Sequence, residues 1–180
     1  MRIHWPRFAG AAIDPENYRD FFEKAPFRSD LDYDYNAPVD DIWPIISGPR
    51  MWSWLPTVWG CRYPEDEVIG PGTVRDFQMF LHRWLVYAQH ERILHWDKGS
   101  RIVYTATDAT LPFFGSWCEE YRLEPLDGGT RTRLHWTLAV RPRYIGWLPA
   151  QWLAVALKPI FRFGLLALPR ELPMRAAGPA

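Results

Sequence analysis

Polar and apolar residues alternate one by one between Asp30 and Tyr35, where three aspartates are interleaved with a leucine and two tyrosines. A period of two is typical of a strand with one buried face, so we expect Tyr33 and Tyr35 to point inward and the aspartates to face solvent. Six more strands are predicted at residues 58–64, 73–82, 85–95, 101–108, 113–124 and 130–140. The connections at 97–100 and 126–129 carry the Gly and Asp residues of tight hairpins, which makes neighbouring strands antiparallel.

Two short helices are predicted between the first of these strands and the second. Pro38 opens one of them, because its fixed φ suits a first helical turn, and Asp40 and Asp41 follow where the helix dipole favours negative charge. Pro44 is expected to kink this helix or to end it early. The other short helix is expected over residues 51–55.

A longer helix is predicted near the end of the chain, over residues 148–168, with a bend at Pro159. Residues at steps of three and four form its expected apolar side, Leu153, Leu157, Ile160, Gly164 and Leu168, and another side carries Ala154, Lys158 and Arg162. Residues 144–157 are uncharged, but about 20 such residues are needed to span a bilayer. We therefore expect the helix to pack across the sheet. Contact with a membrane surface through Trp147 and Trp152 is kept as an alternative.

The order of these elements predicts one α+β domain with a helix-grip fold, in which a curved antiparallel sheet wraps around a long C-terminal helix. A chain of 180 residues is long enough for one core, since a domain of this size buries roughly 70% of its unfolded surface. We expect an N-terminal leader at residues 1–26 with a short helix near 15–22, the domain at 27–170, and a C-terminal tail at 171–180.

Charge and cysteine content exclude several classes of protein. The 21 basic and 21 acidic residues cancel and no long basic block is present, so a nucleic-acid partner is not expected. Cys61 and Cys118 lack the spacing of a disulfide scaffold or a zinc site and are expected to be buried small hydrophobes. Residues 1–22 show no apolar signal segment, so a cytoplasmic location is expected. The 18 Arg against 3 Lys are compatible with a GC-rich bacterial genome.

Four spaced motifs carry a family resemblance: Asn36–Trp43, Trp54–Pro56, Gly72–Arg75 and Gly128–Thr130. Over residues 28–170 the chain resembles the SRPBCC superfamily, also called START-like, and within it the polyketide cyclase/dehydrase and lipid-transport group. The resemblance implies a helix-grip fold with a hydrophobic ligand cavity. It does not specify a reaction, because members include lipid carriers, aromatic polyketide cyclases, hormone receptors and chaperone cofactors.

Glu119 is the first candidate for chemistry. Along residues 113–123 the odd positions form the apolar face, which puts the Glu119 carboxyl on the inward side of its strand. Desolvation between aromatic residues should raise its pKa, which suits a general acid or a hydrogen-bond donor to a ligand carbonyl. The alternative is a structural role, in which Glu119 pairs with an inward arginine.

Arg75 is the candidate partner, because it shares one strand face with Phe77 and Met79. An inward arginine binds a carboxylate or polarises a carbonyl in bidentate fashion. The resemblance to cyclases, in which an inward arginine contacts the ligand, implies the same role here. The alternative is an exposed Arg75, since a bulge would flip the register.

The predicted cavity lining is apolar, with a few phenol groups to orient a guest molecule. The candidate ligand-binding residues are Tyr33, Tyr35, Phe77, Met79, Tyr104, Trp117, Tyr121, Trp136, Leu153, Leu157 and Phe161. An ordinary core would use the same residue types, and only a void between sheet and helix distinguishes the two.

Other chemistries find little support. His90 and His95 lie five residues apart on a predicted strand and so face opposite sides, which excludes a shared metal ion, and His135 is expected to face solvent. Residues 115–118 lack the second glycine of a nucleophile elbow. No glycine-rich phosphate loop is present. No metal and no cofactor are expected.

The sequence therefore predicts a protein that binds a hydrophobic small molecule, such as a lipid, polyketide or isoprenoid-like compound, as a carrier or sensor. One alternative is a cyclase or dehydratase acting on a polyketide-like substrate, with Glu119 as proton donor or acceptor and Arg75 holding a carbonyl. Another is a module that docks a partner protein or a membrane surface through its aromatic rim. No feature of the sequence indicates an oligomeric state.

Overall fold

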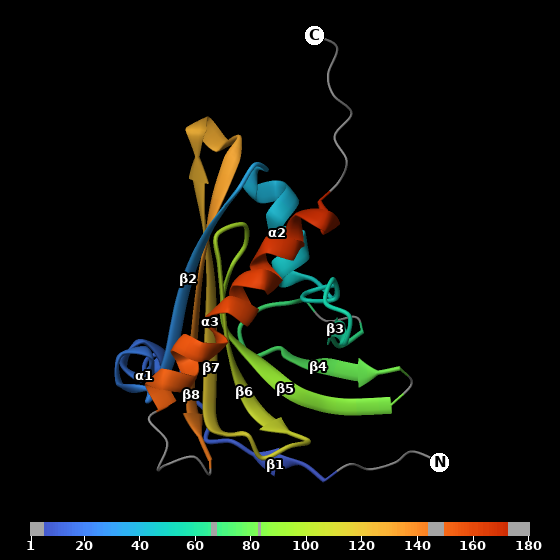
Figure 1. Ribbon diagram of the computed structural model, residues 1–180, viewed down its shortest axis with the longest axis vertical. Coiled ribbons are helices and arrows are strands. Elements are labelled where there is room, and N and C mark those ends of the chain that lie inside the picture. Colours follow the sequence, from blue (N-terminus) through green and yellow to red (C-terminus); the bar gives the residue numbers. More distant parts are fainter. Residues whose placement is uncertain (1–5, 66–67, 83, 144–149, 173–180) are drawn as a thin grey trace.

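The computed structural model describes residues 6–65, 68–82, 84–143 and 150–172 of the chain. Within these residues the chain forms three α-helices and eight strands (Figure 1). They are β1 (Phe8–Ala9), α1 (Tyr18–Lys24), β2 (Phe27–Tyr35), α2 (Val39–Ser47), β3 (Val58–Arg62), β4 (Val74–Leu81), β5 (Trp84–Asp97), β6 (Arg101–Ala109), β7 (Phe114–Leu126), β8 (Arg131–Pro142) and α3 (Ala150–Ala167). Short 3-10 turns at Asp127–Gly129 and Leu168–Glu171 follow β7 and α3.

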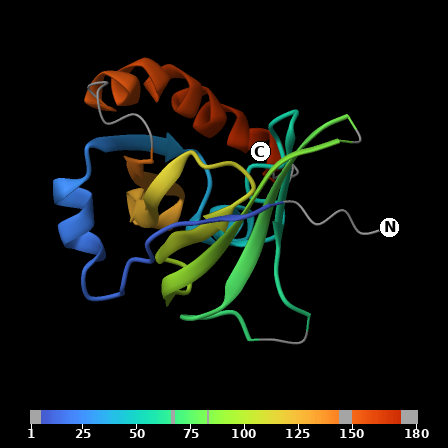
Figure 2. The same ribbon diagram turned by 90° about the horizontal axis from the view of Figure 1, so that it is seen from below.

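The strands form one curled antiparallel sheet in the order β2-β8-β7-β6-β5-β4-β3, with β1 paired to β6. Tight turns join its central strands, and Gly99 adopts the positive φ of 78° that closes the turn between β5 and β6. α3 lies across the concave side of the sheet (Figure 1, Figure 2). This arrangement confirms the predicted helix-grip fold.

The alternating segment at the start of the domain is β2, which pairs with β8 along its whole length. Tyr35 faces inward and is 1% exposed, while the aspartates lie on the outer side. Each aspartate has a basic partner there, and the pairs are Asp30 with Arg28, Asp32 with His135, and Asp34 with Arg133. The period of two therefore identified both faces of this strand.

The outer face of the sheet is covered as well, by the leader that precedes β2. Tyr18 and Phe22 of α1 pack with Ile13 against the outer side of the central strands, where they meet Cys118. Ser116 and Cys118 occupy even positions of β7, opposite the predicted apolar face, and both are buried. Burial of Cys118 agrees with the expectation for its residue type, whereas alternation within β7 did not reveal that a second layer covers this face.

Two local predictions between β2 and β3 differ from the structure. α2 continues through Pro44 to Ser47, so of the two predicted alternatives, a kink or an early end, the early end is wrong. Residues 51–54 form turns instead of a helix. Trp52 has a φ of +62°, a left-handed conformation that a helix does not accommodate.

α3 also continues past its proline, Pro159, and its buried side matches the predicted one only in part. As predicted, two residues of that side are buried and a third is half-buried, namely Gly164, Leu168 and Leu157 in that order. Ala154 and Leu165 are buried, whereas Ile160 is 64% exposed. Because apolar residues occur all around this helix, their spacing left the orientation ambiguous. Within the part of the chain that the structure describes, none of the helices combines the length and apolar character that a bilayer crossing requires.

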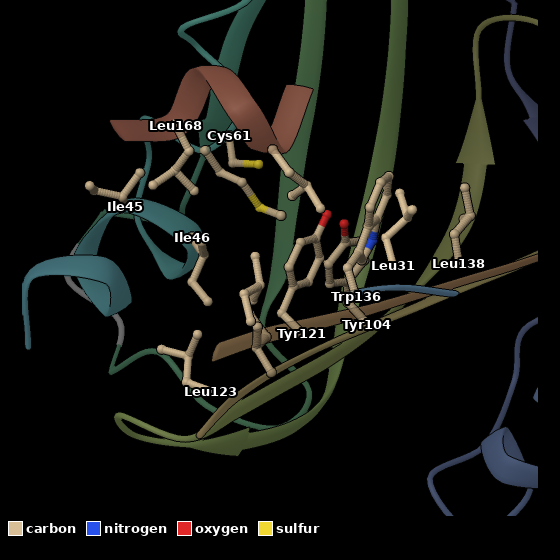
Figure 3. Packing of buried hydrophobic residues seen from close by; sticks show 14 of the residues in the cluster. Leu31, Ile45, Ile46, Cys61, Tyr104, Tyr121, Leu123, Trp136, Leu138 and Leu168 are labelled. Atoms are coloured by element: carbon tan, nitrogen blue, oxygen red, sulfur yellow. The ribbon is translucent and has the colours of Figure 1, made fainter. Parts of the chain in front are cut away.

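The main core fills the space between the concave face, α2 and the end of α3. Tyr104, Tyr121 and Trp136, from three neighbouring strands, lie as a row of stacked rings in its centre (Figure 3), with centroids 6.2 Å and 5.7 Å apart. Cys61 is buried in the same core, and neither it nor Cys118 forms a disulfide. The prediction of two buried cysteines is thus confirmed.

Candidate functional site

A cavity of about 250 Å³ lies between the concave face of the sheet, the turn after α2, and α3. Ile160 is both part of its lining and exposed, so the cavity reaches the surface beside α3. Its polar side chains are Gln89, Glu91 and Glu119, together with the phenols of Tyr87 and Tyr104. The rest of the lining is apolar and consists of Trp52, Leu55, Val58, Phe77, Met79, Trp117, Trp136, Leu138, Ile160 and Phe161.

The structure brings only some of the eleven predicted ligand-binding residues to the cavity. The residues that line the cavity are Phe77, Met79, Tyr104, Trp117, Trp136 and Phe161. Tyr33, Tyr121 and Leu157 belong instead to the packed core. Tyr35 donates a hydrogen bond of 2.9 Å to the carbonyl of Leu165 and so ties β2 to α3. The side chain of Leu153 lies outside the described residues.

Glu119 projects from β7 into the cavity wall and is 5% exposed. Three neutral donors surround its carboxyl group at 2.8 Å: the indole of Trp117 on Oε1, and the phenol of Tyr121 and the indole of Trp136 on Oε2. Trp117 and Tyr121 share its strand face at two residues on either side, and Trp136 lies opposite Tyr121 on β8. The strand register itself therefore builds this group of donors.

Burial raises the pKa of Glu119, and the negative charge of Glu91 raises it further. Hydrogen bonds from Tyr104, Tyr121 and Trp136 act in the opposite direction, because they stabilise the ionised carboxylate. Desolvation outweighs them, so Glu119 holds its proton at a higher pH than an exposed glutamate.

Arg75 is buried at the start of β4 and its side chain has no exposed surface. Its guanidinium donates to Glu91 Oε2 at 2.6 Å, to the Tyr63 hydroxyl at 2.8 Å and to Met51 Sδ at 3.3 Å. It also lies 4.2 Å from the centroid of the Tyr104 ring. Arg75 faces inward, as one of the two sequence alternatives held, but it is not among the residues that line the cavity.

The arginine partner of Glu119 that the sequence suggested is therefore not found. Arg75 pairs with Glu91, a carboxylate that the sequence analysis did not single out. The two residues lie directly opposite each other in the β4–β5 hairpin. The register shifts within this hairpin, so counting outward from its turn would have placed His90, not Glu91, opposite Arg75.

Glu91 connects this ion pair to two other cavity-lining residues, Gln89 and Tyr87, through a short chain of hydrogen bonds along β5. Gln89 donates to Glu91 Oε1, and Tyr87 donates to the Gln89 side-chain carbonyl, both at 2.5 Å. These residues alternate along one face of the strand. The cavity wall thus presents two carboxylates, of which only Glu91 has a cationic partner.

The histidines are distributed as expected for structural residues. His90 contacts Asp108 at 3.0 Å, and His95 contacts the carbonyl of Pro15 at 3.2 Å. His135 lies on the outer side of β8. Among the described residues, no cluster of three or more histidine, cysteine or acidic side chains has the arrangement of a metal site.

The raised pKa of Glu119 predicts a pH-dependent stability. A folded-state pKa above the unfolded value, ordinarily 4.5, means that the folded state binds this proton more tightly. The free energy of unfolding should therefore fall as the pH rises from about 4.5 through the folded-state pKa. Urea unfolding at several pH values should show this fall in the natural protein and a smaller one in Glu119→Gln. If the free energy of unfolding changes with pH in the same way in both proteins, Glu119 is not the group whose pKa is raised in the folded state.

The curled sheet and α3 define a helix-grip protein with a cavity between them. Residues 29–173 match the family described as polyketide cyclase/dehydrase and lipid transport. Since the match covers most of the chain, the protein belongs to this family. Among curated proteins, the uncharacterized protein Rv2574 of Mycobacterium tuberculosis strain H37Rv is 24% identical over 120 residues, which are 66% of this chain and 68% of that protein.

Solved structures with the same fold include the Zhui aromatase/cyclase from Streptomyces sp. R1128, with a TM-score of 0.60 and 20% identity over 85% of this chain and 98% of that one. The di-domain aromatase/cyclase BexL gives a TM-score of 0.61 and 16% identity over 80% of this chain and 45% of that one. The structure of Ara h 8.0201 gives a TM-score of 0.58 and 15% identity over 78% of this chain and 93% of that one. At such identities the likeness shows a shared fold.

Proposed function

We propose that the protein binds a compact hydrophobic molecule in this cavity and acts as its carrier or sensor. The observation that carries the proposal is the character of the lining, which is aromatic and apolar with a few polar groups, as in small-molecule sites. The volume of about 250 Å³ is small for such a site, so a ring system of polyketide or isoprenoid type fits better than a long-chain lipid.

Native mass spectrometry of the purified protein tests this proposal. A stoichiometric apolar adduct, absent from the denatured protein, is expected. Met79→Trp should reduce the adduct because it adds bulk to the lining, whereas Val155→Trp on the exposed side of α3 should leave it unchanged. An empty protein that also binds no aromatic probe added to it would overturn the proposal.

A second candidate is an enzyme that cyclises or dehydrates a polyketide-like substrate. The observation in its favour is Glu119, a buried acid with a raised pKa at the wall of the cavity, in a fold shared with aromatase/cyclases. In this proposal Glu119 moves the proton. Arg75 has only a positioning role, through Glu91, because its guanidinium is already occupied.

The enzyme proposal predicts that the Glu119→Gln substitution abolishes turnover of a neutral polyketide-like substrate. The variant protein should still bind this substrate with nearly unchanged affinity. A loss of about 10²–10⁴-fold in kcat is expected for removal of a general acid or base. Turnover by the variant at the natural rate would exclude Glu119 from that role. Affinity is measured separately, by fluorescence titration.

The carrier proposal also suggests where a hydrophobic ligand is exchanged. The outer side of α3 exposes Trp152, Val155, Phe163 and Leu166. Its only charged residues, Lys158 and Arg162, are basic and exposed. Apolar side chains flanked by positive charges match an anionic bilayer surface, so we propose that α3 contacts anionic lipid when the ligand is loaded.

Flotation with phosphatidylserine vesicles should therefore recover the protein, and neutral phosphatidylcholine vesicles should recover less of it. Replacing Trp152 and Phe163 together by serine should abolish flotation. Trp59→Ser removes an equally exposed tryptophan from β3 and serves as the control. Equal recovery of all three proteins would argue against contact through α3.

A further inference from the structure

The charges around the cavity do not balance. Glu91 and Arg75 neutralise each other at 2.6 Å, and both side chains are almost entirely buried. Glu119 receives only neutral indole and phenol donors, and no Lys, Arg or His lines the cavity within the described residues. When both carboxylates are ionised, the wall therefore carries one negative charge without a counterion.

A buried unpaired carboxylate is costly, and it takes up either a proton or a cation. The groups that face Glu119 come from every neighbouring element: Glu91 on β5, Tyr104 on β6, Tyr121 on β7 and Trp136 on β8. α3 contributes only apolar Ile160 and Phe161 to the lining. Among the described residues no cation faces Glu119, so its charge is removed by protonation or is balanced by a cationic ligand.

The remaining lining suits an organic cation. Trp52, Trp117, Trp136 and Tyr104 contribute their rings to the same cavity, and aromatic rings attract cations, with tryptophan the strongest of them. A ligand carboxylate, in contrast, would find two acidic side chains and no free cation, because the Arg75 guanidinium is fully occupied. The electrostatics favour a protonated amine and disfavour a fatty acid.

We propose that the cavity selects a compact apolar ligand that carries a protonated amine, which pairs with Glu119 among the surrounding indole and phenol rings. This inference rests on the proposed function, since it names the chemical class of the ligand for the same site. Amine binding then replaces the proton that Glu119 otherwise holds.

Three ligands with one ring skeleton test this selectivity: 1-naphthylmethylamine, 1-naphthalenemethanol and 1-naphthoic acid, titrated near neutral pH by calorimetry. The amine is expected to bind about tenfold or more tightly than the alcohol, and the acid most weakly. In Glu119→Gln the preference for the amine should fall about tenfold, while the alcohol binds as before. A circular dichroism spectrum checks that the variant is folded.

The outcomes separate the two proposals. If the alcohol binds the natural protein as tightly as the amine, the cationic ligand is excluded while the hydrophobic binding site stands. If the preference persists in a folded Glu119→Gln, the amine does not pair with Glu119 and this inference is also overturned. If none of the three ligands binds, the proposed function fails and the inference with it.

Discussion

Arg75→Met is expected to lower the free energy of unfolding by about 3–5 kcal/mol, because it leaves Glu91 as an unpaired charge in the interior. The side chains of this pair are 0% and 2% exposed, so water cannot replace the lost guanidinium without a rearrangement of the core. The methionine also removes the donors to Tyr63 and Met51. Urea unfolding monitored by tryptophan fluorescence measures the loss.

Two companion variants identify the cause. Arg75→Met combined with Glu91→Gln removes both charges and should recover much of the stability, since the penalty comes from the unpaired carboxylate. Arg133→Met breaks an arginine–aspartate pair of similar distance on the outer side of the sheet, where solvent screens the charges, and should change stability little. A loss in Arg75→Met no larger than in Arg133→Met would show that water reaches Glu91.

Arg75 and Glu119 show which features of the site can be predicted from the sequence and which cannot. Alternation along a strand is a local property, so it predicted an inward Glu119, and it offered an inward Arg75 as one of two alternatives; both side chains are buried. Their partners depend on which strands are neighbours and in what register. Glu91 lies opposite Arg75 in a hairpin, whereas Trp136 reaches Glu119 from β8. A single sequence does not contain that long-range register.

The two errors in the predicted helices, the partly wrong orientation of α3 and the helix expected around Trp52, have the same physical cause. The spacing of apolar residues could not orient α3, because this helix is apolar on its packed and on its exposed sides. The turn at Trp52 replaces a predicted helix because tertiary contacts hold it: its indole donates to the Tyr121 hydroxyl at 3.0 Å, and its ring packs against Gly164 of α3. Tertiary packing overrides local propensity at both places.

Trp136→Ala is expected to have a second large effect, with a loss of about 3–5 kcal/mol in the free energy of unfolding. Trp136 is 4% exposed and touches three aromatic rings, with centroids 5.1 Å from Trp52, 5.7 Å from Tyr121 and 5.2 Å from Phe161. Binding of an aromatic probe should also be lost, because these contacts join the sheet to α3 across the cavity. Trp152→Ala removes the same side chain from an exposed position and should change stability by no more than about 0.5 kcal/mol.

A milder variant separates packing from hydrogen bonding at this position. Trp136→Phe keeps an aromatic ring but removes the indole donor to Glu119, so it should cost less stability than alanine and raise the pKa of Glu119 further. The fall in stability with rising pH should then extend to higher pH than in the natural protein. If Trp136→Phe leaves the pH profile unchanged, the indole contributes to the core by packing alone. The donors from Trp117 and Tyr121 would then account for the stabilisation of the carboxylate.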